Sequence, residues 1–328
     1  MRVLIADDVF GNPENEVALN TILHIAVRKR CYLDAYQANG QGFAAWYQKL
    51  GKVHQQAWND VSSWSVRDSG LYRLRTWIVT GTPDRQATPP RFTLEDAIGR
   101  VTRPMRIWIE NDRNDRQFWL SHMRSDVRQF FLDMEQQRLV QFDSRGGLGE
   151  LRMALQELFT RSIIDKHDSM VLFDSDAGTP GNISAEAALM TEFCQQASLR
   201  HHCLSRRAIE NYIPKSALYA WVFEKGGKER GRRKKIVDAF FRMTPEQRYH
   251  FRLKSGWDSS PSPPVSALYS SVATADHMTL AQGIAGDIAM VYVTHHASIE
   301  AWAVRDGMDQ GVQKTVDQLA DWIRVPYA

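Results

Sequence analysis

The stretch that decides the fold is Met105-Arg-Ile-Trp-Ile-Glu-Asn-Asp-Arg-Asn-Asp115, taken together with Met170-Val-Leu-Phe-Asp-Ser-Asp176. Each is a short apolar run that ends abruptly in carboxylates. A run of this kind predicts a buried parallel strand, and α/β sheets place their binding sites at the carboxyl ends of such strands. We expect the two strands to be neighbours that bring Glu110, Asp174 and Asp176 to one edge of the sheet.

Three carboxylates at one edge form the hard-oxygen set that Mg²⁺ and Mn²⁺ prefer. These ions suit phosphoryl transfer, in which two metals clamp the attacking and leaving oxygens of a phosphodiester. A structural interpretation stays open, because a single acid after a strand is usually a turn residue or a helix cap, and Asp-x-Asp is often turn chemistry. The order strand–acid, helix, strand, helix, strand–acid-x-acid favours the metal site.

The composition bounds the class of protein. A chain of 328 residues suits two or three domains, and 43% hydrophobic with 24% charged residues is typical of a soluble globular protein. The net charge of +3 neither requires nor excludes a polyanionic partner. Three widely spaced cysteines favour a reducing cytoplasm. The N-terminus is unlike a signal peptide and no apolar run approaches the roughly 20 residues of a membrane span, so we expect a cytoplasmic protein with no membrane partner.

Two α/β segments are expected along the chain. The first is a unit of unknown role over residues 1–85, followed by a linker over 86–102 that begins in a stretch dense in turn formers. A parallel sheet with helices on both faces is expected over 103–214, and residues 215–328 read as helical and basic. The expected strands are 2–6, 31–36, 71–80, 105–109, 139–142, 170–173 and 202–204; the expected helices are 14–30, 42–56, about 115–137, 148–159, and one that Asn182 or Ser184 caps and that ends at Gln196.

This order of strands and acids resembles the TOPRIM domain, the metal-binding fold of topoisomerases, primases and OLD-type nucleases. Its two acidic motifs match Trp108–Asp115 and Leu172–Asp176. The stretch Leu204-Ser-Arg-Arg-Ala-Ile-Glu-Asn-Tyr-Ile213 is similar to the Arg-x-Ile-Glu-Asn-Tyr-Leu stretch of OLD-like TOPRIM nucleases, which include phage-defence effectors paired with ABC-type ATPases. Residues 243–256 look like the downstream Lys-Gly element of the same group.

The resemblance covers residues 103–258 and departs from the family in two places. Asn111 stands where the family has Gly, and the next acid is displaced to Asp112 or Asp115. What the resemblance implies is a Rossmann-like TOPRIM core acting as a metal-dependent endonuclease, a hydrolase of phosphodiester bonds in DNA or RNA, with tRNA a candidate substrate. It also implies an antiviral defence effector, with an ABC-type ATPase and a second copy of the chain as candidate partners.

By the same resemblance, two Mg²⁺ or Mn²⁺ ions are held by Glu110, Asp174 and Asp176. Glu210 is then a further ligand or orients a water at the metal, and Lys254 contributes positive charge at the scissile phosphate. Alternatives stay open for these two residues. Lys254 reads equally as a solvated surface lysine, and Glu210 as a helix-capping residue beside Tyr212 and Ile213 in the core.

The run from Lys225 to Lys235 carries seven Lys or Arg against one Glu and is interrupted by glycines. A loop of this composition supplies the phosphate contacts that dominate affinity for nucleic acid. Its alternative is a solvated charged surface, and the flanking aromatic residues are expected in buried helix faces. The candidate nucleic-acid-binding residues are Lys228, Arg230, Arg232, Arg233, Lys234 and Lys235.

Two rival functions stay open. Residues 173–179, with Asp174 as nucleophile and Asp176 as acid/base, resemble the opening of haloacid-dehalogenase-like phosphatases, although Ala177 is inserted and the family's last acidic motif is incomplete at Gly286-Asp287. The other rival is a non-catalytic TOPRIM module of an ATPase. In the first unit, the pair Asp7-Asp8 resembles that of receiver-like or nuclease-like α/β folds, and we expect a docking or sensing role there.

Overall fold

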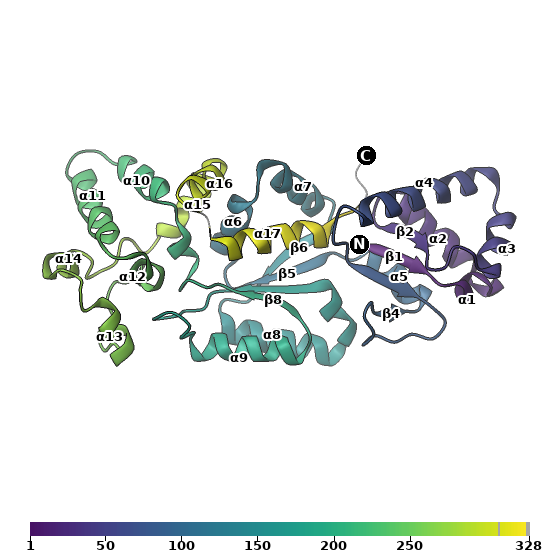
Figure 1. Cartoon of the computed structure of the whole chain (residues 1–328), viewed down its shortest axis with the longest axis horizontal. Helices are drawn as coiled ribbons and strands as arrows, with labels where there is room; N and C mark the ends of the chain where they lie inside the picture. Colours follow the sequence, from purple (N-terminus) through teal and green to yellow (C-terminus); the bar gives the residue numbers. More distant parts are fainter. Residues whose placement is uncertain (308, 326–328) are drawn as a thin grey trace. The chain divides into compact units, whose positions relative to one another are not determined.

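The computed structural model describes residues 1–307 and 309–325, apart from the side chains of residues 163 and 164. The chain divides into two compact units. Unit 1 comprises residues 1–105, 130–141 and 317–325, and unit 2 comprises Arg106–Gln129 and Phe142–Val316. Each unit has an α/β architecture around a four-stranded sheet, which confirms the expected α/β class (Figure 1).

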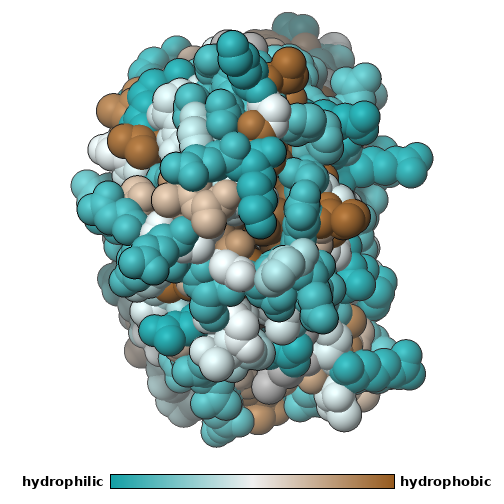
Figure 2. Space-filling model, turned by 90° about the vertical axis from the view of Figure 1, so that its right-hand side faces the viewer, coloured by the Kyte–Doolittle hydropathy of each residue, from teal (hydrophilic) through white to brown (hydrophobic). Residues whose placement is uncertain are grey.

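The sheet of unit 1 has the order β2-β1-β3-β4, and its paired strands are all parallel. Its strands are β1 (Arg2–Ile5), β2 (Tyr32–Ala35), β3 (Thr76–Val79) and β4 (Arg91–Phe92), and its helices are α1 (Asp7–Phe10), α2 (Glu16–Val27), α3 (Gln41–Lys49), α4 (Lys52–Ser69) and α5 (Leu94–Val101), with a 3-10 turn at Pro13–Asn15. Alternate side chains of β1, Val3 and Ile5, are fully buried. Figure 2 shows one end of the molecule, where hydrophilic residues predominate and apolar ones are scattered among them.

The expected elements of unit 1 need three corrections. The helix expected over 42–56 is two helices, because Leu50 and Gly51 both adopt extended backbone angles between α3 and α4. The strand expected over 71–80 is confined to β3. Residues 86–102, expected as a linker, hold β4 and α5. Thr93 begins α5 by accepting a hydrogen bond from the backbone N–H of Asp96.

The acidic pair of unit 1 ties loops together at the end of β1. The Asp7 carboxylate accepts hydrogen bonds from the backbone N–H groups of Gly42 and Phe43, at 3.1 and 2.8 Å. The Asp8 carboxylate accepts from Thr80 Oγ1 and from the Gly81 N–H, at 3.1 and 2.8 Å. Asp7 therefore holds the first turn of α3, and Asp8 holds the segment that follows β3.

The sheet of unit 2 has the order β6-β5-β7-β8. Its strands are β5 (Met105–Ile109), β6 (Val140–Ser144), β7 (Ser169–Phe173) and β8 (Arg200–Cys203). Strand β5 pairs in parallel with β7, with Trp108 opposite Val171, and β7 pairs in parallel with β8. Every residue of β7 is buried, as its unbroken apolar sequence predicts. The expectation that the two acid-bearing strands are neighbours is confirmed.

Helices cover both faces of this sheet (Figure 1). On one face, α8 (Leu148–Arg161) and α9 (Ala185–Gln196) pack into a core that includes Trp108 and Val171. On the other lies α6 (Asp112–His122), with Phe118 fully buried. The helix expected over 115–137 is two helices, α6 and α7 (Ser125–Gln136), because Met123 is extended. Of the two candidate caps of α9, Ser184 is the one that caps it.

The remainder of the chain is helical, as expected. Its helices are α10 (Lys215–Phe223), α11 (Gly227–Arg242), α12 (Pro245–His250), α13 (Pro263–Tyr269), α14 (Thr274–Thr279), α15 (Val291–Thr294), α16 (His296–Arg305) and α17 (Gln310–Ile323). The 3-10 turns of unit 2 are η2 (Ile163–Asp168), η3 (Ile209–Tyr212) and η4 (Ile288–Met290). Within the described ranges, no helix combines the length and the apolar character needed to cross a bilayer.

Candidate functional site

The two acidic motifs meet at the carboxyl ends of β5 and β7. Glu110 follows β5 directly, and its Oε1 accepts a hydrogen bond of 3.1 Å from the backbone N–H of Asp174, which follows β7. Asp174 in turn accepts, at Oδ1, a hydrogen bond of 3.1 Å from the backbone N–H of Ile209. Three segments that are far apart in the sequence are therefore joined at one sheet edge, and the third is the Ile-Glu-Asn-Tyr stretch.

Asp115 is the displaced acid that belongs to this site. Its Oδ2 accepts hydrogen bonds from the backbone N–H groups of Glu110 and Asn111, at 3.1 and 2.8 Å. The Asn111 side chain caps α6 by accepting hydrogen bonds from the backbone N–H groups of Arg113 and Asn114. The other candidate acid, Asp112, is exposed in the first turn of α6. Asparagine is a common N-cap residue, so Asn111 could have indicated a helix start that places Asp115 in the first turns of α6.

The Asp174-Ser-Asp176 segment is a fixed turn. Ser175 Oγ donates to the Arg206 carbonyl at 2.8 Å, and the Asp176 N–H donates to the Arg207 carbonyl at 2.8 Å. Asp176 has φ of +47°, the left-handed region that residues other than glycine rarely adopt. In a continuous extended strand, residues 174 and 176 would point to the same face, and residue 176 would lie further along the strand. The turn ends the strand before this point. Both carboxylates thus stay at the sheet edge.

Glu210 and Lys254 form an ion pair beside these carboxylates. Lys254 Nζ lies 2.6 Å from Glu210 Oε1, and the Glu210 side chain is only 3% exposed. Lys254 is therefore paired with a buried carboxylate, although its own side chain is half exposed. Glu210 faces this lysine instead of capping a helix. The backbone just after Lys254 turns through Gly256, whose φ of +77° favours glycine.

Asn211 explains why an asparagine follows Glu210. Its Nδ2 donates to the carbonyls of Arg248 and Phe251, at 2.8 and 2.9 Å, and its Oδ1 accepts from the Ala208 N–H at 3.1 Å. One buried amide side chain therefore joins the turn that carries Glu210 to the segment that leads into Lys254. Sequence reasoning missed this role, because the partners are backbone groups that no residue pattern reveals.

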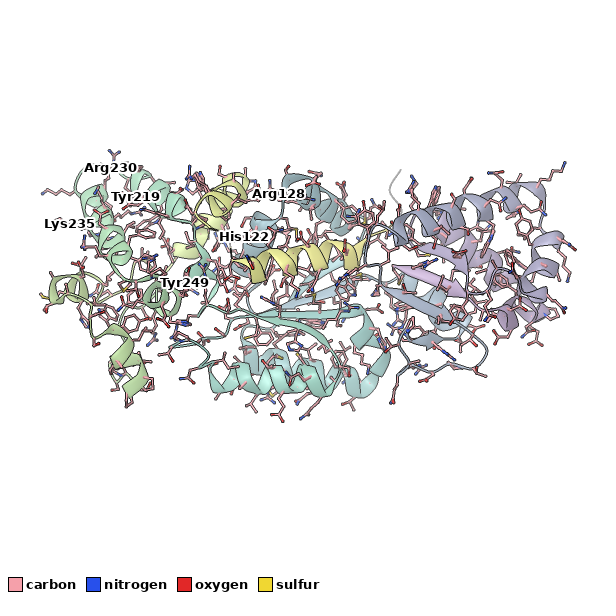
Figure 3. All side chains as sticks on the ribbon, in the orientation of Figure 1. His122, Arg128, Tyr219, Arg230, Lys235 and Tyr249 are labelled. Carbon is pink, nitrogen blue, oxygen red and sulfur yellow. The ribbon has the colours of Figure 1, made fainter. Side chains whose placement is uncertain are left out.

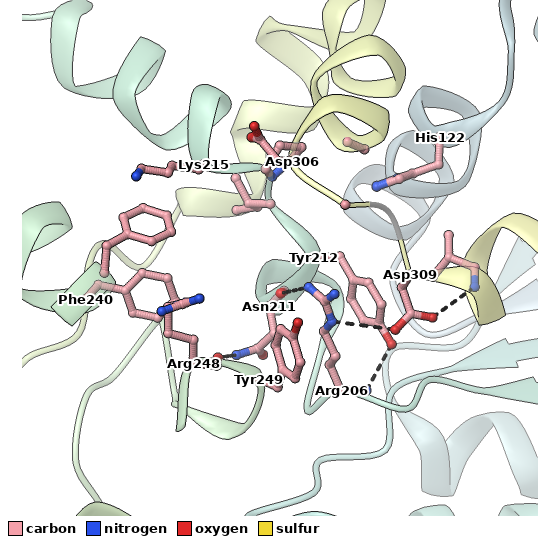
Figure 4. Close-up of a pocket in the computed structure, with 16 residues that line it drawn as sticks. His122, Arg206, Asn211, Tyr212, Lys215, Phe240, Arg248, Tyr249, Asp306 and Asp309 are labelled. Atoms are coloured by element: carbon pink, nitrogen blue, oxygen red, sulfur yellow. Dashed lines mark hydrogen bonds and ion pairs between the residues drawn. The ribbon is translucent and has the colours of Figure 1, made fainter. Parts of the chain in front are cut away.

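Tyr212 and Arg206 hold the other side of the same loop (Figure 4). The Tyr212 hydroxyl accepts from the Arg206 backbone N–H at 2.9 Å. The Arg206 guanidinium lies 3.9 Å from the ring centre of Tyr249 and 4.6 Å from that of Tyr212. Tyr212 and Ile213 are buried, which confirms the expected core packing. This network fixes the loop that presents Glu210.

The carboxylates raise one another's affinity for protons. Burial, together with the charges of Asp115 and Asp176, raises the pKa of Glu110 to about 7. Burial and the charge of Glu210 raise the pKa of Asp115 to about 6. The pKa of Asp174 is well above its ordinary value, because burial and the charges of Asp115, Glu110 and Glu210 all oppose ionisation. Burial is the largest cause in each case, and the neighbouring negative charges add to it.

Lys254 and Arg207 supply the positive charge near the cluster. Although burial opposes it, the Glu210 carboxylate raises the pKa of Lys254 above its usual value. Arg207 Nη2 lies 4.0 Å from Asp176 Oδ1. Two cations face five carboxylates, those of Glu110, Asp115, Asp174, Asp176 and Glu210. Such an excess of carboxylates favours the uptake of protons or of a cation.

The donor set fits a hard divalent ion in charge and in ligand type, because it consists of carboxylate oxygens. Within the part of the chain that the structure describes, no three His, Cys, Asp or Glu side chains converge as a ready metal cluster. Instead, Glu110, Asp115 and Asp174 accept hydrogen bonds from backbone amides.

The basic run forms helix α11, and the expectation of a glycine-interrupted loop is wrong. Arg233 is a packing residue: its guanidinium lies 3.9 Å from the Trp221 ring centre, and Nη1 donates to the Trp221 carbonyl at 2.7 Å. Arg232 and Lys234 are paired with acids on their own helix. Lys228, Arg230 and Lys235 are exposed, and Figure 3 shows the last two at the periphery of the helical region.

No protein-family model, curated protein or solved structure matches this chain.

Proposed function

We propose that unit 2 is a metal-dependent nuclease that hydrolyses phosphodiester bonds of DNA or RNA. The observation that carries the proposal is the hydrogen bond that joins Glu110 of one strand end to Asp174 of its parallel neighbour. Beside it, the buried Glu210 is paired with Lys254. Clustered acids with raised pKa values beside a cation are typical of sites that bind a metal and a phosphate.

In the proposed mechanism, Glu110, Asp174 and Asp176 would hold Mg²⁺ or Mn²⁺, with Glu210 as a further candidate ligand. The ions, when bound, neutralise charge on the phosphoryl oxygens and make water a better nucleophile. Lys254 keeps its proton because Glu210 is adjacent, and its ammonium stabilises negative charge that develops on the phosphate. Asp115 fixes the backbone at the end of β5, which keeps Glu110 in place.

The test compares purified wild type with Asp174→Ala and Glu110→Gln on plasmid DNA and total RNA, with Mg²⁺, Mn²⁺ or EDTA. We expect metal-dependent cleavage that falls by about 100-fold or more in both variants, since each removes a metal ligand. Asp112→Asn is the matched control, because Asp112 is an exposed acid of the same segment. Metal-independent cleavage, or equal activity of all four proteins, would contradict the proposal.

The rival phosphatase function is separated by the same variants. A phosphatase that uses Asp174 as nucleophile hydrolyses p-nitrophenyl phosphate, loses this activity in Asp174→Asn and keeps it in Glu110→Gln. The hydrogen bond between Glu110 and the Asp174 N–H favours a shared site, in which both substitutions abolish activity together.

The resemblance to TOPRIM effectors extends the proposal to an antiviral role, with an ABC-type ATPase as partner and tRNA as a candidate substrate. Overexpression of wild type should then arrest growth, whereas Glu110→Ala should be harmless at equal protein level. Equal toxicity of the two would exclude the effector role without excluding the nuclease. Metal-binding calorimetry separates a nuclease that awaits its partner from a module that binds no metal.

A further inference from the structure

A cavity of about 790 Å³ in unit 2 adjoins the candidate metal centre. Its lining includes Asp176 of the acidic cluster and Arg207, which is paired with that residue. The Ser/Pro segment over 258–262 contributes another part of the lining. Sites for small organic ligands usually have volumes of roughly 300–1,000 Å³, so the cavity is large enough for one nucleotide.

An aromatic cluster lines the cavity around Trp257. The Trp257 ring is stacked on that of His277, with centres 4.3 Å apart and planes 10° apart. Its Nε1 donates to the His277 carbonyl at 2.7 Å. Tyr269 lies edge-on to Trp257 at 5.0 Å, and Phe251 lies edge-on at 4.7 Å. The cluster is fixed by these contacts, and flat aromatic surfaces in a concave site are what nucleobases stack on.

The same cavity offers groups suited to a sugar and a phosphate. The Arg207 side chain is 21% exposed, and a guanidinium binds phosphate in a two-pronged manner. Arg252 also lines the cavity, where it lies 3.6 Å from Asp258. The hydroxyl-bearing residues Ser260, Ser262 and Ser266 add hydrogen-bonding groups to the lining. Aromatic rings, arginines and hydroxyls together match the chemistry of a nucleotide.

We propose that this cavity binds one unpaired nucleotide of the substrate strand, with its base at Trp257 and Tyr269 and its phosphate at Arg207. The inference rests on the proposed nuclease function, because Asp176 is shared between the cavity and the acidic cluster. A paired base must leave its stack before it can enter such a cavity, which costs free energy. Single-stranded or looped nucleic acid is therefore the preferred substrate, and intact duplex is disfavoured.

The test measures binding separately from cleavage, by fluorescence anisotropy of labelled oligonucleotides in the Asp174→Asn background with Mg²⁺ present. The probes are single strands of about 12 nucleotides, as DNA and as RNA, and a duplex of the same sequence; this length is within the range of known single-strand sites. We expect Trp257→Leu to weaken single-strand binding about tenfold or more, and Trp257→Phe to retain most of it. Trp64→Leu, which changes a partly buried tryptophan of unit 1, should leave binding unchanged.

Arg207→Gln is a second variant that leaves the aromatic cluster intact. It should weaken single-strand binding and lower the salt dependence by about one phosphate contact. Circular dichroism and thermal melting check that each variant is folded. The proposal is overturned if both folded variants bind the single strand like the parent, or if duplex binds as tightly as single strand. It is also overturned if free mononucleotides bind in a Trp257-dependent manner while oligonucleotides do not.

The two proposals fail in different ways. Trp257-dependent binding without any metal-dependent cleavage by the wild type contradicts the nuclease and leaves a single-strand binding site. Cleavage that Glu110→Gln abolishes, together with oligonucleotide binding that neither Trp257→Leu nor Arg207→Gln changes, contradicts the cavity and leaves the nuclease.

Discussion

The buried carboxylate of Glu210 lies 2.6 Å from the ammonium of Lys254, and the side chain of the next residue, Asn211, joins the two segments that carry them. A buried carboxylate without its cation is costly, so the position of Lys254 matters for both stability and chemistry. The contacts that position this pair can be tested separately from the acids that would hold a metal.

Asn211→Ala should destabilise unit 2. The substitution removes three hydrogen bonds, so the carbonyls of Arg248 and Phe251 and the N–H of Ala208 lose a partner. The side chain that they lose is buried, because Asn211 is only 7% exposed. An unsatisfied buried polar group costs about 1–3 kcal/mol, so we expect a loss of about 2 kcal/mol or more in the free energy of unfolding. Urea denaturation measures it. Asn182→Ala, at an exposed position, should change stability by less than about 0.5 kcal/mol.

Gly256→Ala should displace the turn after Lys254. At φ of +77°, a Cβ on residue 256 would lie 2.3 Å from the Ala281 carbonyl oxygen, so the backbone must move. We expect a fall in the melting temperature and reduced nuclease activity. Gly231→Ala is the matched control: Gly231 is in α11 with open space around it, and the change should stabilise the helix by about 0.5–1 kcal/mol. Equal behaviour of the two variants would show that the turn is tolerant.

The contribution of Glu110 to the stability of the metal-free protein should fall as the pH rises from about 4.5 to 7. The folded-state pKa of Glu110 is about 7 against an ordinary value of 4.5, so the folded state binds the proton more tightly than the unfolded state. This contribution is complete below pH 4.5 and is lost by about pH 7. It amounts to about 3 kcal/mol relative to Glu110→Gln, which does not titrate.

Chemical denaturation of both proteins between pH 5 and 8 measures this difference. Asp115, with a pKa of about 6, adds a loss over a lower range, from its ordinary 3.8 upward, in both proteins. Mg²⁺ should restore stability at pH 8 in wild type more than in the variant, because it binds the ionised carboxylates. A wild-type-minus-variant difference that is flat with pH would contradict the assigned environment of Glu110.

The exposed cations of α11 that are not paired with acids of their own helix should contribute most to nucleic-acid binding. Replacing Lys228, Arg230 and Lys235 with Gln should weaken binding and flatten its salt dependence without loss of stability. Arg233→Gln should instead destabilise the packing of α11 on α10, because Arg233 stacks on Trp221 and its side chain is only 12% exposed. Unchanged binding in the triple variant would leave α11 as a solvated helix.

The sequence predicts the two central strands of unit 2 well, because β5 and β7 are short, mainly apolar runs that end in carboxylates. Strand β7 ends at the residue before Asp174, and Ser184 caps α9 as one of two candidates. Helix breaks were missed at Leu50 and Met123, where an apolar residue with extended backbone fits the helical pattern on either side. Strand β4 was missed because two residues, Arg91 and Phe92, show no periodicity.

The site was predicted in its residues more than in its contacts. Glu110 and Asp174 come together as the motif order indicated, and Asp115 is one of the two acids that the sequence offered for the displaced position. The contacts of Asn211 and Arg207 emerged only from the structure. Hydrogen bonds to backbone groups of distant segments, such as the Ile209 N–H that Asp174 accepts, leave no pattern in a sequence. The basic run was misjudged because its glycines suggested a loop, while Gly231 is accommodated inside α11.

Unit 1 is assembled from segments that are far apart in the sequence and are therefore synthesised at different times. Its sheet is translated first, yet residues 317–325 belong to the same unit, where Arg73 donates its N–H to Asp321 and Arg324 lies 3.6 Å from the Tyr72 ring centre. Nearly all of unit 2 emerges in between. In the nascent chain, the part of unit 1 that contacts residues 317–325 therefore stays exposed until synthesis reaches those residues, which include the end of α17. A fragment that ends at residue 105 would lack residues 317–325, so the surface that they cover in unit 1 would remain exposed.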